Sequence, residues 1–236
     1  MSDRATPDEQ QRVALAVSTV IFALRPHPTT RRLAVHLPLV RRIRAPHQGR
    51  WALPGGPLGA SEGLGAAASR TLGETTRLRP RYLEQLYAFG GPDRAPSAAE
   101  RTVSIVYWAM VRPQEADAGV AGVNVRWFLA DELPELAFDH NLIVEYALWR
   151  LRNKLEYSRI AAAFLGETFT LAELRGVHEA VLQRPLDPAN FRRQMEASGR
   201  LVPTDEFRTG GRHRPARLFR HDESIHLADN GPLTRA

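Results

Sequence analysis

The chain contains 236 residues, of which 43% are hydrophobic and 25% charged, a composition typical of globular proteins with one large domain or two small ones. It has no cysteine, which excludes disulfides and thiolate metal sites, and no apolar run of 18 or more residues that would predict a membrane span. Because the N-terminal segment is polar and mixed in charge, we expect no secretory signal and a cytoplasmic protein without a membrane partner.

The first predicted elements are three strands, and the last of them leads into a glycine-containing turn. Residues 13–24 are β-branched and apolar without polar alternation, which predicts a strand buried on both faces. Residues 33–37 have the alternating pattern of a half-buried strand, and a hairpin is the simplest way to join the two. A short strand over residues 51–53 then leads into the turn Pro54-Gly55-Gly56.

A glycine, two glutamates and an arginine are placed at defined intervals around a predicted helix over residues 64–76. Five residues separate Gly56 from Glu62, seven separate Glu62 from Arg70, and Glu74 lies four residues further along, where it can pair with Arg70. This spacing resembles the Nudix box, G-x5-E-x7-R-E-U-x-E-E-x-G-U, in which U is a bulky aliphatic residue. The resemblance predicts a Nudix-like domain with its box helix at this position.

The same segment departs from the Nudix box at three positions. Thr71, Thr75 and Arg77 stand where the pattern has glutamate, glutamate and glycine. In the family, the box glutamates share one helix face and form the carboxylate cluster that a hard cation such as Mg²⁺ requires. A threonine hydroxyl is uncharged and cannot serve as a carboxylate base. We therefore expect a degenerate box, comprising Glu62, Arg70, Thr71, Glu74 and Thr75, with most or all pyrophosphate hydrolysis lost, no metal site, and Mg²⁺-dependent ligand binding in doubt.

Further strands and a helix complete the first domain. Its remaining elements are expected over residues 82–89, 103–111, 123–129 and 142–155. The segment around residues 84–94, followed by an aromatic and β-branched strand, resembles the corresponding region of Nudix proteins that bind ADP-ribose. Asp139 or Asn141 can cap the helix. The first domain thus has several strands, one helix inserted between them and one helix after them. This order predicts an α+β fold over residues 1–155, with the architecture of a Nudix-like α/β/α sandwich.

The pattern then changes to three short helices and a hairpin, over residues 156–222. Thr170 and Glu173 have the spacing of a capping box, and Asp187 with Pro188 opens the next helix. Two short strands, 201–203 and 216–220, follow. This order is the plan of a winged helix-turn-helix domain. No Gly/Ser linker separates the two domains, which favours mechanical coupling between them. Residues 223–236 are expected to form a mobile tail.

The positive charge of the chain is concentrated in this second domain. The net charge of the chain is +6. Residues 190–220 contain eight arginines and only three acidic residues, so much of the positive charge lies in this segment. On the DNA interpretation, the third helix enters the major groove while hairpin arginines meet phosphates or the minor groove. The predicted contacts are Asn190, Arg192, Arg193, Arg208, Arg212, Arg214 and Arg217. The alternatives are a solvated basic face on a protein-binding domain and an RNA-binding domain.

A degenerate Nudix domain followed by a winged helix resembles the Nudix-related transcriptional regulators of NAD metabolism. The resemblance implies a dimeric repressor that binds double-stranded operator DNA, requires no cofactor, and is released by ADP-ribose or a related nucleotide effector. It implies ligand contacts from Arg50, Trp51, Gly55, Gly56, Glu62, Arg70 and Glu74. The alternative function is an active Nudix hydrolase of the ADP-ribose pyrophosphatase type, in which Glu62 and Glu74 are residual Mg²⁺ ligands.

Overall fold

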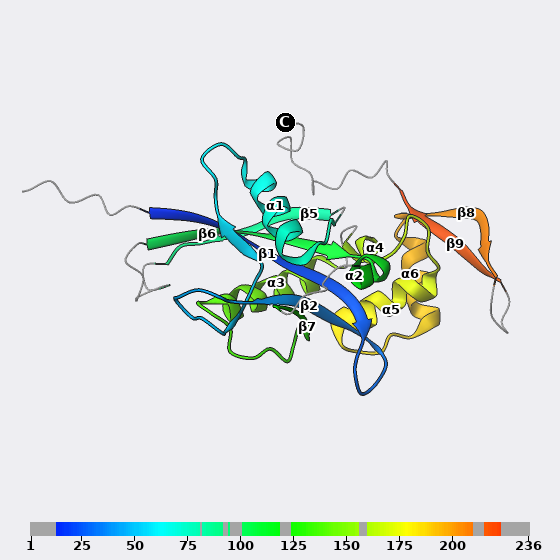
Figure 1. The fold of residues 1–236 in the computed structure, drawn as a ribbon. Coiled ribbons are helices and arrows are strands. Elements are labelled where there is room, and N and C mark those ends of the chain that lie inside the picture. The colour runs from blue at the N-terminus through cyan, green and yellow to red at the C-terminus, as the bar shows by residue number, and fades with distance from the viewer. Residues whose placement is uncertain are drawn as a thin grey trace, which may run out of the picture.

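The computed structural model describes residues 13–80, 82–91, 94, 101–118, 124–155, 160–209 and 215–222 (Figure 1). The elements in chain order are β1 (Val13–Pro26), β2 (Leu33–Arg41), β3 (Trp51–Ala52), β4 (Gly55–Pro57), α1 (Leu64–Thr76), β5 (Tyr82–Phe89), β6 (Arg101–Val111), α2 (Pro113–Ala118), β7 (Val125–Leu129), α3 (His140–Lys154), α4 (Ile160–Ala163), α5 (Leu171–Leu182), α6 (Pro188–Ala197), β8 (Leu201–Arg208) and β9 (Ala216–His221).

The first seven strands form one mixed sheet with β1 near its centre. The strand order is β3-β2-β1-β6-β5, and β4 and β7 pair with β1 and β2 outside this path. β1 runs parallel to β6 and antiparallel to β2, which confirms the predicted hairpin. Residues 17–24 are buried, as predicted for β1, but residues 13–16 are half-buried or exposed, against the prediction. The prediction of a half-buried strand over residues 33–37 is wrong for residues 35–37. Val35 and Leu37 pack in the cluster shared with α3 and α5, and His36 on the other face is buried as well.

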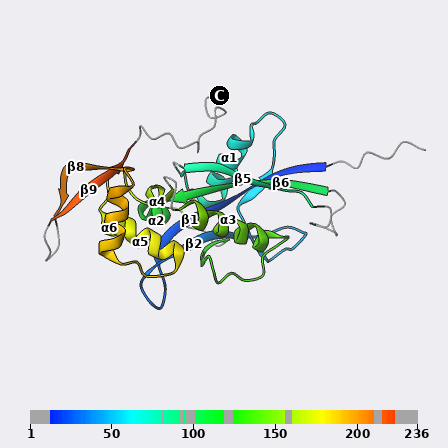
Figure 2. The same ribbon diagram turned by 180° about the vertical axis from the view of Figure 1, so that it is seen from behind.

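Helices cover both faces of this sheet, as Figures 1 and 2 show for α1 and α3. Alternate residues of β1 point to opposite faces. Val20 and Phe22 belong to the same buried cluster as Ile143 of α3, whereas Ile21 packs with Leu72 of α1. The predicted α/β/α sandwich is therefore confirmed.

The box helix α1 has the predicted bounds, and it ends before the first proline that follows it. Pro80 cannot continue a helix, but α1 already stops at Arg77, which has a left-handed backbone with φ 60°. Glycine is preferred at such a position because it carries no Cβ. Arg77 occupies the place of the glycine in the Nudix box, so the backbone of the box is retained although its glycine is lost.

Two further differences concern elements near the turns. The short strand β4 and the helix α2 lack a sequence pattern of their own, and β4 exists through its pairing with β1. Asp139 occupies the N-cap position of α3 without making a side-chain capping bond. Asn141 instead secures the preceding turn, accepting from Leu136 N at 2.8 Å and donating to Pro134 O at 3.0 Å.

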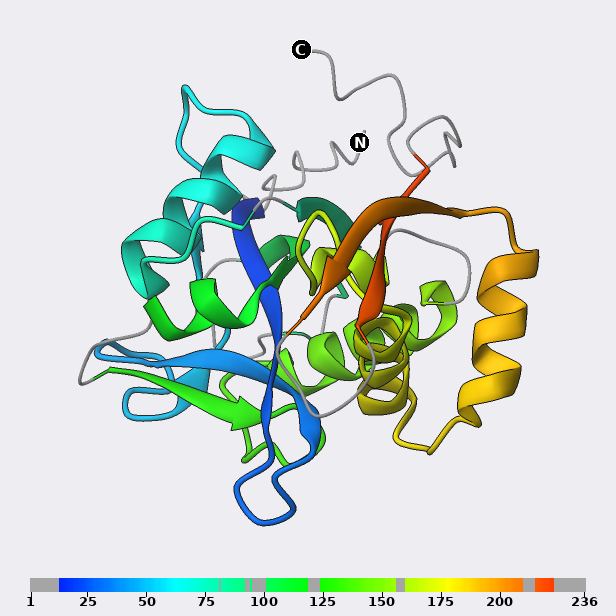
Figure 3. The same cartoon turned by 90° about the vertical axis from the view of Figure 1, so that its right-hand side faces the viewer.

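The C-terminal unit contains the predicted helices and hairpin, and Figure 3 shows α6 standing at its outer edge beside β8 and β9. The capping box is confirmed, because Thr170 accepts from Glu173 N at 3.2 Å and Glu173 accepts from Thr170 N at 2.8 Å. Asp187 caps α6 by accepting from Asn190 N at 2.7 Å. The expected tail, residues 223–236, and the first residue of the expected first helix, Arg159, lie outside the described residues.

The C-terminal helices share their core with the sheet. One continuous buried cluster joins Phe22 of β1 and Leu151 of α3 to Phe164, Leu174 and Val177 of the C-terminal unit. α3 ends at Lys154, so a single helix does not carry the chain from one unit into the other, and the shared core makes this connection instead. Within the described ranges, no helix has the length and apolar character needed to cross a membrane.

Candidate functional site

A cavity of about 310 Å³ lies against the glycine turn that precedes α1. Its wall includes the turn itself, two arginines from loops, and the entrance to α3, namely Gly55, Gly56, Arg42, Arg94, Phe138 and His140. These residues come from distant parts of the chain, and the sheet brings them together. The cavity is therefore a product of the tertiary fold.

The two glycines of the turn permit a close approach of the backbone to its neighbours. A Cβ atom on Gly55 would lie 2.5 Å from the carbonyl oxygen of Val17, so a larger residue cannot be placed there without a shift of the backbone. A Cβ atom on Gly56 would lie 3.3 Å from the side chain of Thr71. The turn is thus packed between β1 and the box helix, with its other side on the cavity.

Arg42 and Arg94 place two guanidinium groups on the cavity wall. Arg94 is held by Asp139 Oδ2, 2.5 Å from its Nε, and by Phe89 O, 2.9 Å from its Nη1. Arg42 donates from Nε to Pro46 O at 2.8 Å and lies 4.6 Å from the centre of the Phe138 ring. Burial lowers the pKa of Arg42. Two fixed guanidinium groups are suited to an anionic ligand, above all to phosphate oxygens.

His140 contributes an uncharged donor to the same wall. Its Nδ1 accepts a hydrogen bond from the backbone N–H of Leu53 at 3.0 Å, so the ring proton must be on Nε2. Burial lowers the pKa of His140 to about 4, and the nearby carboxylate of Asp139 opposes this effect. At neutral pH the ring therefore adds a hydrogen-bond donor but no charge.

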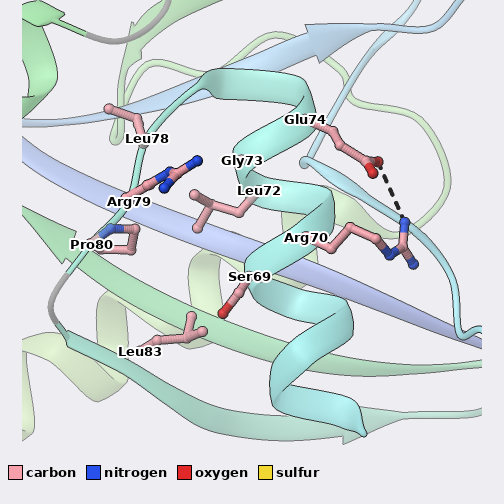
Figure 4. Close-up of a pocket in the computed structure, with 9 residues that line it drawn as sticks. All are labelled: Ser69, Arg70, Leu72, Gly73, Glu74, Leu78, Arg79, Pro80 and Leu83. Carbon is pink, nitrogen blue, oxygen red and sulfur yellow. Dashed lines mark hydrogen bonds and ion pairs between the residues drawn. The ribbon is translucent and has the colours of Figure 1, made fainter. Parts of the chain in front are cut away.

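The charged residues of the box form an ion-pair network on α1. Arg70 donates from Nη2 and Nε to the two carboxylate oxygens of Glu62, at 2.6 and 3.0 Å, and Gly59 N donates to the same carboxylate at 2.8 Å. The bonds from Arg70, followed by the bond from Gly59, lower the pKa of Glu62 to about 2. Arg70 also pairs with Glu74 at 3.4 Å, as their spacing predicts (Figure 4).

The two threonines of the box use their hydroxyl groups within their own helix. Thr71 is buried and donates to Ala67 O at 2.9 Å, and Thr75 donates to Thr71 O at 2.5 Å. Among the residues that the structure describes, no three histidine or acidic side chains gather in a group able to hold a metal ion. Because hydroxyls stand in place of two box carboxylates and Arg70 binds both Glu62 and Glu74, this set of donors does not fit the Mg²⁺ ion that a complete Nudix box would hold.

The structure separates the predicted ligand residues into two groups. Gly55 and Gly56 line the cavity, while Glu62, Arg70 and Glu74 form the network on α1. The other two predicted residues are engaged elsewhere. Arg50 pairs with Glu135 at 2.6 Å, and the Trp51 ring packs 5.0 Å from that of Phe128.

Sequence reasoning did not find three of the cavity residues, Arg42, Arg94 and His140. Arg42 is one of several arginines before the turn, and Arg94 lies in a loop without a periodic pattern. His140 follows Asp139, a potential cap, and has no metal-ligand spacing. The segment that resembles ADP-ribose binding proteins, residues 84–94, contains Arg94, and this resemblance is the one sequence feature that could have indicated one of these three residues.

A second hollow, of about 610 Å³, lies beside the C-terminal half of α1. Figure 4 shows Leu72, Leu78 and Leu83 beside it, and Arg70 and Glu74, which also line it, point toward one another. This hollow is larger and also contains two arginines, Arg70 and Arg79, but it lacks the closely packed glycine backbone of the first. The cavity beside Gly55 and Gly56 is therefore the candidate ligand site.

The predicted DNA contacts of the third helix lie on the exposed side of α6. Phe191 is buried, whereas the Arg192 side chain is 67% exposed and donates to Glu196 at 2.8 Å. Arg193 donates to Asn190 Oδ1 at 2.8 Å. These intrahelical bonds hold the polar side chains in place, and partners in nucleic acid can replace them.

The hairpin presents two more of the predicted cations. Arg208 pairs with Glu173 of the capping box, and Arg217 donates to Thr204 O at 2.8 Å. A groove of about 750 Å³ separates α6 from the hairpin, and both Arg192 and Arg217 line it. Figure 3 shows α6 and the hairpin strands β8 and β9 on the same side of the molecule. Arg212 and Arg214, also predicted contacts, lie outside the described residues.

Comparison with known proteins finds relatives for both units. A model of the NUDIX domain matches residues 17–147, and a model of the NrtR DNA-binding winged helix domain matches residues 161–221. Over 187 residues, the chain is 33% identical to the ADPR responsive transcriptional repressor NtrR of Acinetobacter baylyi, an alignment that covers 77% of this chain and 74% of the relative. The chain belongs to the NrtR family of Nudix-related transcriptional regulators.

Two further proteins define the extent of the similarity. The NrtR of Shewanella oneidensis, crystallised with a 27mer DNA, is 34% identical with a TM-score of 0.72, and the match covers 88% of this chain and 93% of that one. An ADP-ribose pyrophosphatase of Methanocaldococcus jannaschii is 34% identical over 113 residues, 48% of this chain and 66% of the relative. The NrtR family likeness thus extends over both units, whereas the enzyme matches about half of the chain.

Proposed function

We propose that this chain is a transcriptional repressor whose Nudix unit binds ADP-ribose or a related nucleotide and whose winged helix binds operator DNA. The observation that carries the proposal is the presence, in one packed chain, of a cavity with two arginines and of an exposed basic helix and hairpin. The named relatives, an ADPR responsive repressor and an NrtR crystallised with DNA, support both halves. Genes of NAD metabolism are the proposed targets.

In this proposal, the pyrophosphate of the effector lies near Arg42 and Arg94. The close backbone of Gly55 and Gly56 provides room for it, and the Nε2–H of His140 offers a hydrogen bond to a ribose or phosphate oxygen. The predicted contacts of Arg50, Trp51, Glu62, Arg70 and Glu74 remain proposals. A ligand that extends from the cavity over α1 would be needed to reach the last three.

Release of the operator by the effector would follow from thermodynamic coupling between the two sites. The effector binds better to one arrangement of the two units and operator DNA binds better to another, so each ligand weakens the other. A coupling of about 1 to 3 kcal/mol changes the operator affinity by roughly 5 to 150-fold. A gel shift on DNA from upstream of this gene, with and without ADP-ribose, tests this. Retardation that ADP-ribose, NAD and related nucleotides all leave unchanged would refute the sensing role.

For the DNA half, we propose the contacts Asn190, Arg192, Arg193, Arg208, Arg212, Arg214 and Arg217. Arg193 on the exposed side of α6 is the best candidate for a base contact. Arg193→Ala should weaken specific binding by about 1 to 3 kcal/mol and relax the sequence preference. Arg217→Ala, in the hairpin, should mainly reduce the salt dependence of binding. Equal binding of wild type and Arg193→Ala would instead favour an RNA-binding or protein-binding role.

We further propose that the Nudix box no longer catalyses hydrolysis. The hydroxyls of Thr71 and Thr75 donate to carbonyls of their own helix, and Arg70 binds both Glu62 and Glu74. The alternative, an active hydrolase, is favoured by the similarity to the archaeal ADP-ribose pyrophosphatase. Rapid Mg²⁺-dependent release of AMP from ADP-ribose, abolished in Glu74→Gln, would establish the alternative.

We also propose a homodimer as the functional form, because a twofold protein matches a palindromic operator. The proposed units are residues 1–155 and 156–222. Sedimentation equilibrium tests the dimer directly, since the mass of one chain is 26.4 kDa. A mass of one chain at the concentrations that retard DNA would contradict this part of the proposal.

A further inference from the structure

One helix, α3, reaches both proposed sites. It starts at His140 on the cavity wall and ends at Lys154, beside the C-terminal unit. Fifteen residues at about 1.5 Å each span roughly 22 Å. Ile143, Ala147 and Leu151 are fully buried along its length, so the helix is packed as a rigid element. A displacement at its first turn would therefore also move its last turn.

At the cavity end, Asp139 is in an unusual state for a helix cap. An N-cap aspartate normally has an extended backbone and accepts from the N–H groups of the first turn. Asp139 has φ −97° and ψ 24°, and its side chain makes no capping bond. One carboxylate oxygen is bound to Arg94, while the other, Oδ1, is buried and has no hydrogen-bond partner among the described residues. An unpaired buried oxygen raises the free energy of this arrangement, which reduces its advantage over one in which the carboxylate caps the helix.

At the other end, Arg152 connects α3 to α5. Its Nε donates to Val181 O at 3.2 Å, which satisfies a carbonyl at the C-terminal turn of α5. Its Nη2 donates to Asp131 Oδ1 at 2.7 Å, and the other oxygen of Asp131 accepts from Gln183, the C-cap residue of α5. The last turn of α3 and the end of α5 are thus bound to one another directly and through Asp131.

We propose that Asp139 is a positioning residue with two states, paired with Arg94 or capping α3, and that Arg152 transmits the change to α5. This inference rests on the proposed function. An anionic effector that takes over the guanidinium of Arg94 releases the carboxylate, which then accepts from the first-turn N–H groups. The first turn tightens, α3 shifts, and Arg152 carries α5, and with it the DNA-binding unit, into a different position.

Two substitutions of Asp139 separate the two states. Asp139→Asn keeps an oxygen able to cap but removes the charge that holds Arg94, whereas Asp139→Ala removes both functions. In fluorescence anisotropy with the upstream DNA fragment and no ADP-ribose, the Asn variant should bind at least about fivefold more weakly than wild type, as wild type does with ADP-ribose. The Ala variant should stay within about threefold of free wild type. Equal affinities of the Asn and Ala variants would overturn the proposal.

The connection at α5 is tested with Arg152→Ala and its matched control Arg150→Ala, which removes a cation from the same helix. Arg152→Ala should bind ADP-ribose within about twofold of wild type but lose most of the ADP-ribose effect on DNA binding, while the control retains it. Urea unfolding establishes that each variant is folded, and if Arg152→Ala is not, Asp131→Asn replaces it.

The experiments distinguish failure of the proposed function from failure of the inference about Asp139 and Arg152. If wild type shows no ADP-ribose effect on DNA binding, the proposed function is wrong and this inference falls with it. If wild type responds and Arg152→Ala responds equally, only the inference is wrong. Amide hydrogen exchange gives an independent readout, because ADP-ribose should increase the protection of Asn141 and Leu142 in the first turn of α3 in wild type and not in Asp139→Ala. Unchanged protection in wild type would contradict the capping state.

Discussion

Arg70 binds the carboxylates of Glu62 and Glu74, and its bonds to Glu62 keep that carboxylate ionised at low pH. The Glu62 carboxylate keeps its negative charge to about pH 2 because Arg70 and the Gly59 N–H donate to it. In Arg70→Gln, the pKa of Glu62 should rise toward the ordinary value near 4.5, whereas Glu74→Gln should leave it low. Carbon NMR titration of the carboxyl groups measures both. A wild-type midpoint near 4.5 would show that the bidentate pair does not persist in solution.

His140 makes the stability of the protein depend on pH. Its pKa is about 4 in the folded protein, mainly through burial, and about 6.5 when unfolded. Between these values the unfolded chain binds more protons, so the free energy of unfolding falls as the pH is lowered from 7 toward 4. From pH 7 to pH 5 this loss is about 2 kcal/mol.

His140→Gln should remove that part of the pH dependence, because the glutamine oxygen can still accept from Leu53 N without titrating. Urea denaturation of both proteins at pH 7 and pH 5 measures the difference. The same loss of stability in the variant would show that another group, such as the buried His36, whose pKa burial also lowers, is responsible.

The contacts of a residue could be predicted from the sequence where its partner lies a few residues away along the same helix. The pairing of Arg70 with Glu74 and the cap made by Thr170 follow from spacing along one helix, and both are present. Arg42 and Arg94 meet only through the folded sheet, and no spacing indicates this. Asp139 shows the limit most clearly, since a residue with a strong capping tendency binds an arginine from another loop.

At the scale of elements, helix α5 depends on its capping box. Thr170→Ala removes the acceptor for Glu173 N and should destabilise the protein by about 1 kcal/mol. Urea denaturation measures the loss, with Thr30→Ala as control, because Thr30 is exposed in a turn and bonds through its backbone N–H. An equal effect of the two substitutions would mean that the capping box contributes little.

Most elements could be located from hydrophobic period and turn residues. The spacing of the box residues located helix α1 and a continuous apolar run located strand β1, and the structure contains both elements. The pattern of β2 misled because both faces of the strand are covered, so that His36 is buried as well as Val35 and Leu37. β4 has no pattern of its own, since its two glycines lie in the sheet only through pairing with β1.

At the scale of the molecule, the two units pack against one another through a shared core. Leu174 and Val177 of α5 belong to the same buried cluster as Leu37 of β2 and Leu151 of α3. The missing Gly/Ser linker in the sequence suggested coupling, but the packing of α5 on α3 and β2 could not be predicted from periodicity. This packing gives the effector cavity a physical route to the DNA-binding unit.

The most direct test of this account is whether the two sites influence one another to the same extent. The affinity for the upstream DNA is measured by anisotropy with and without saturating ADP-ribose, and the affinity for ADP-ribose by calorimetry with and without saturating DNA. Both affinities should fall by the same factor, roughly 5 to 150-fold, because linkage is reciprocal. Tight binding of each ligand with no change in the affinity for the other would contradict the proposed coupling.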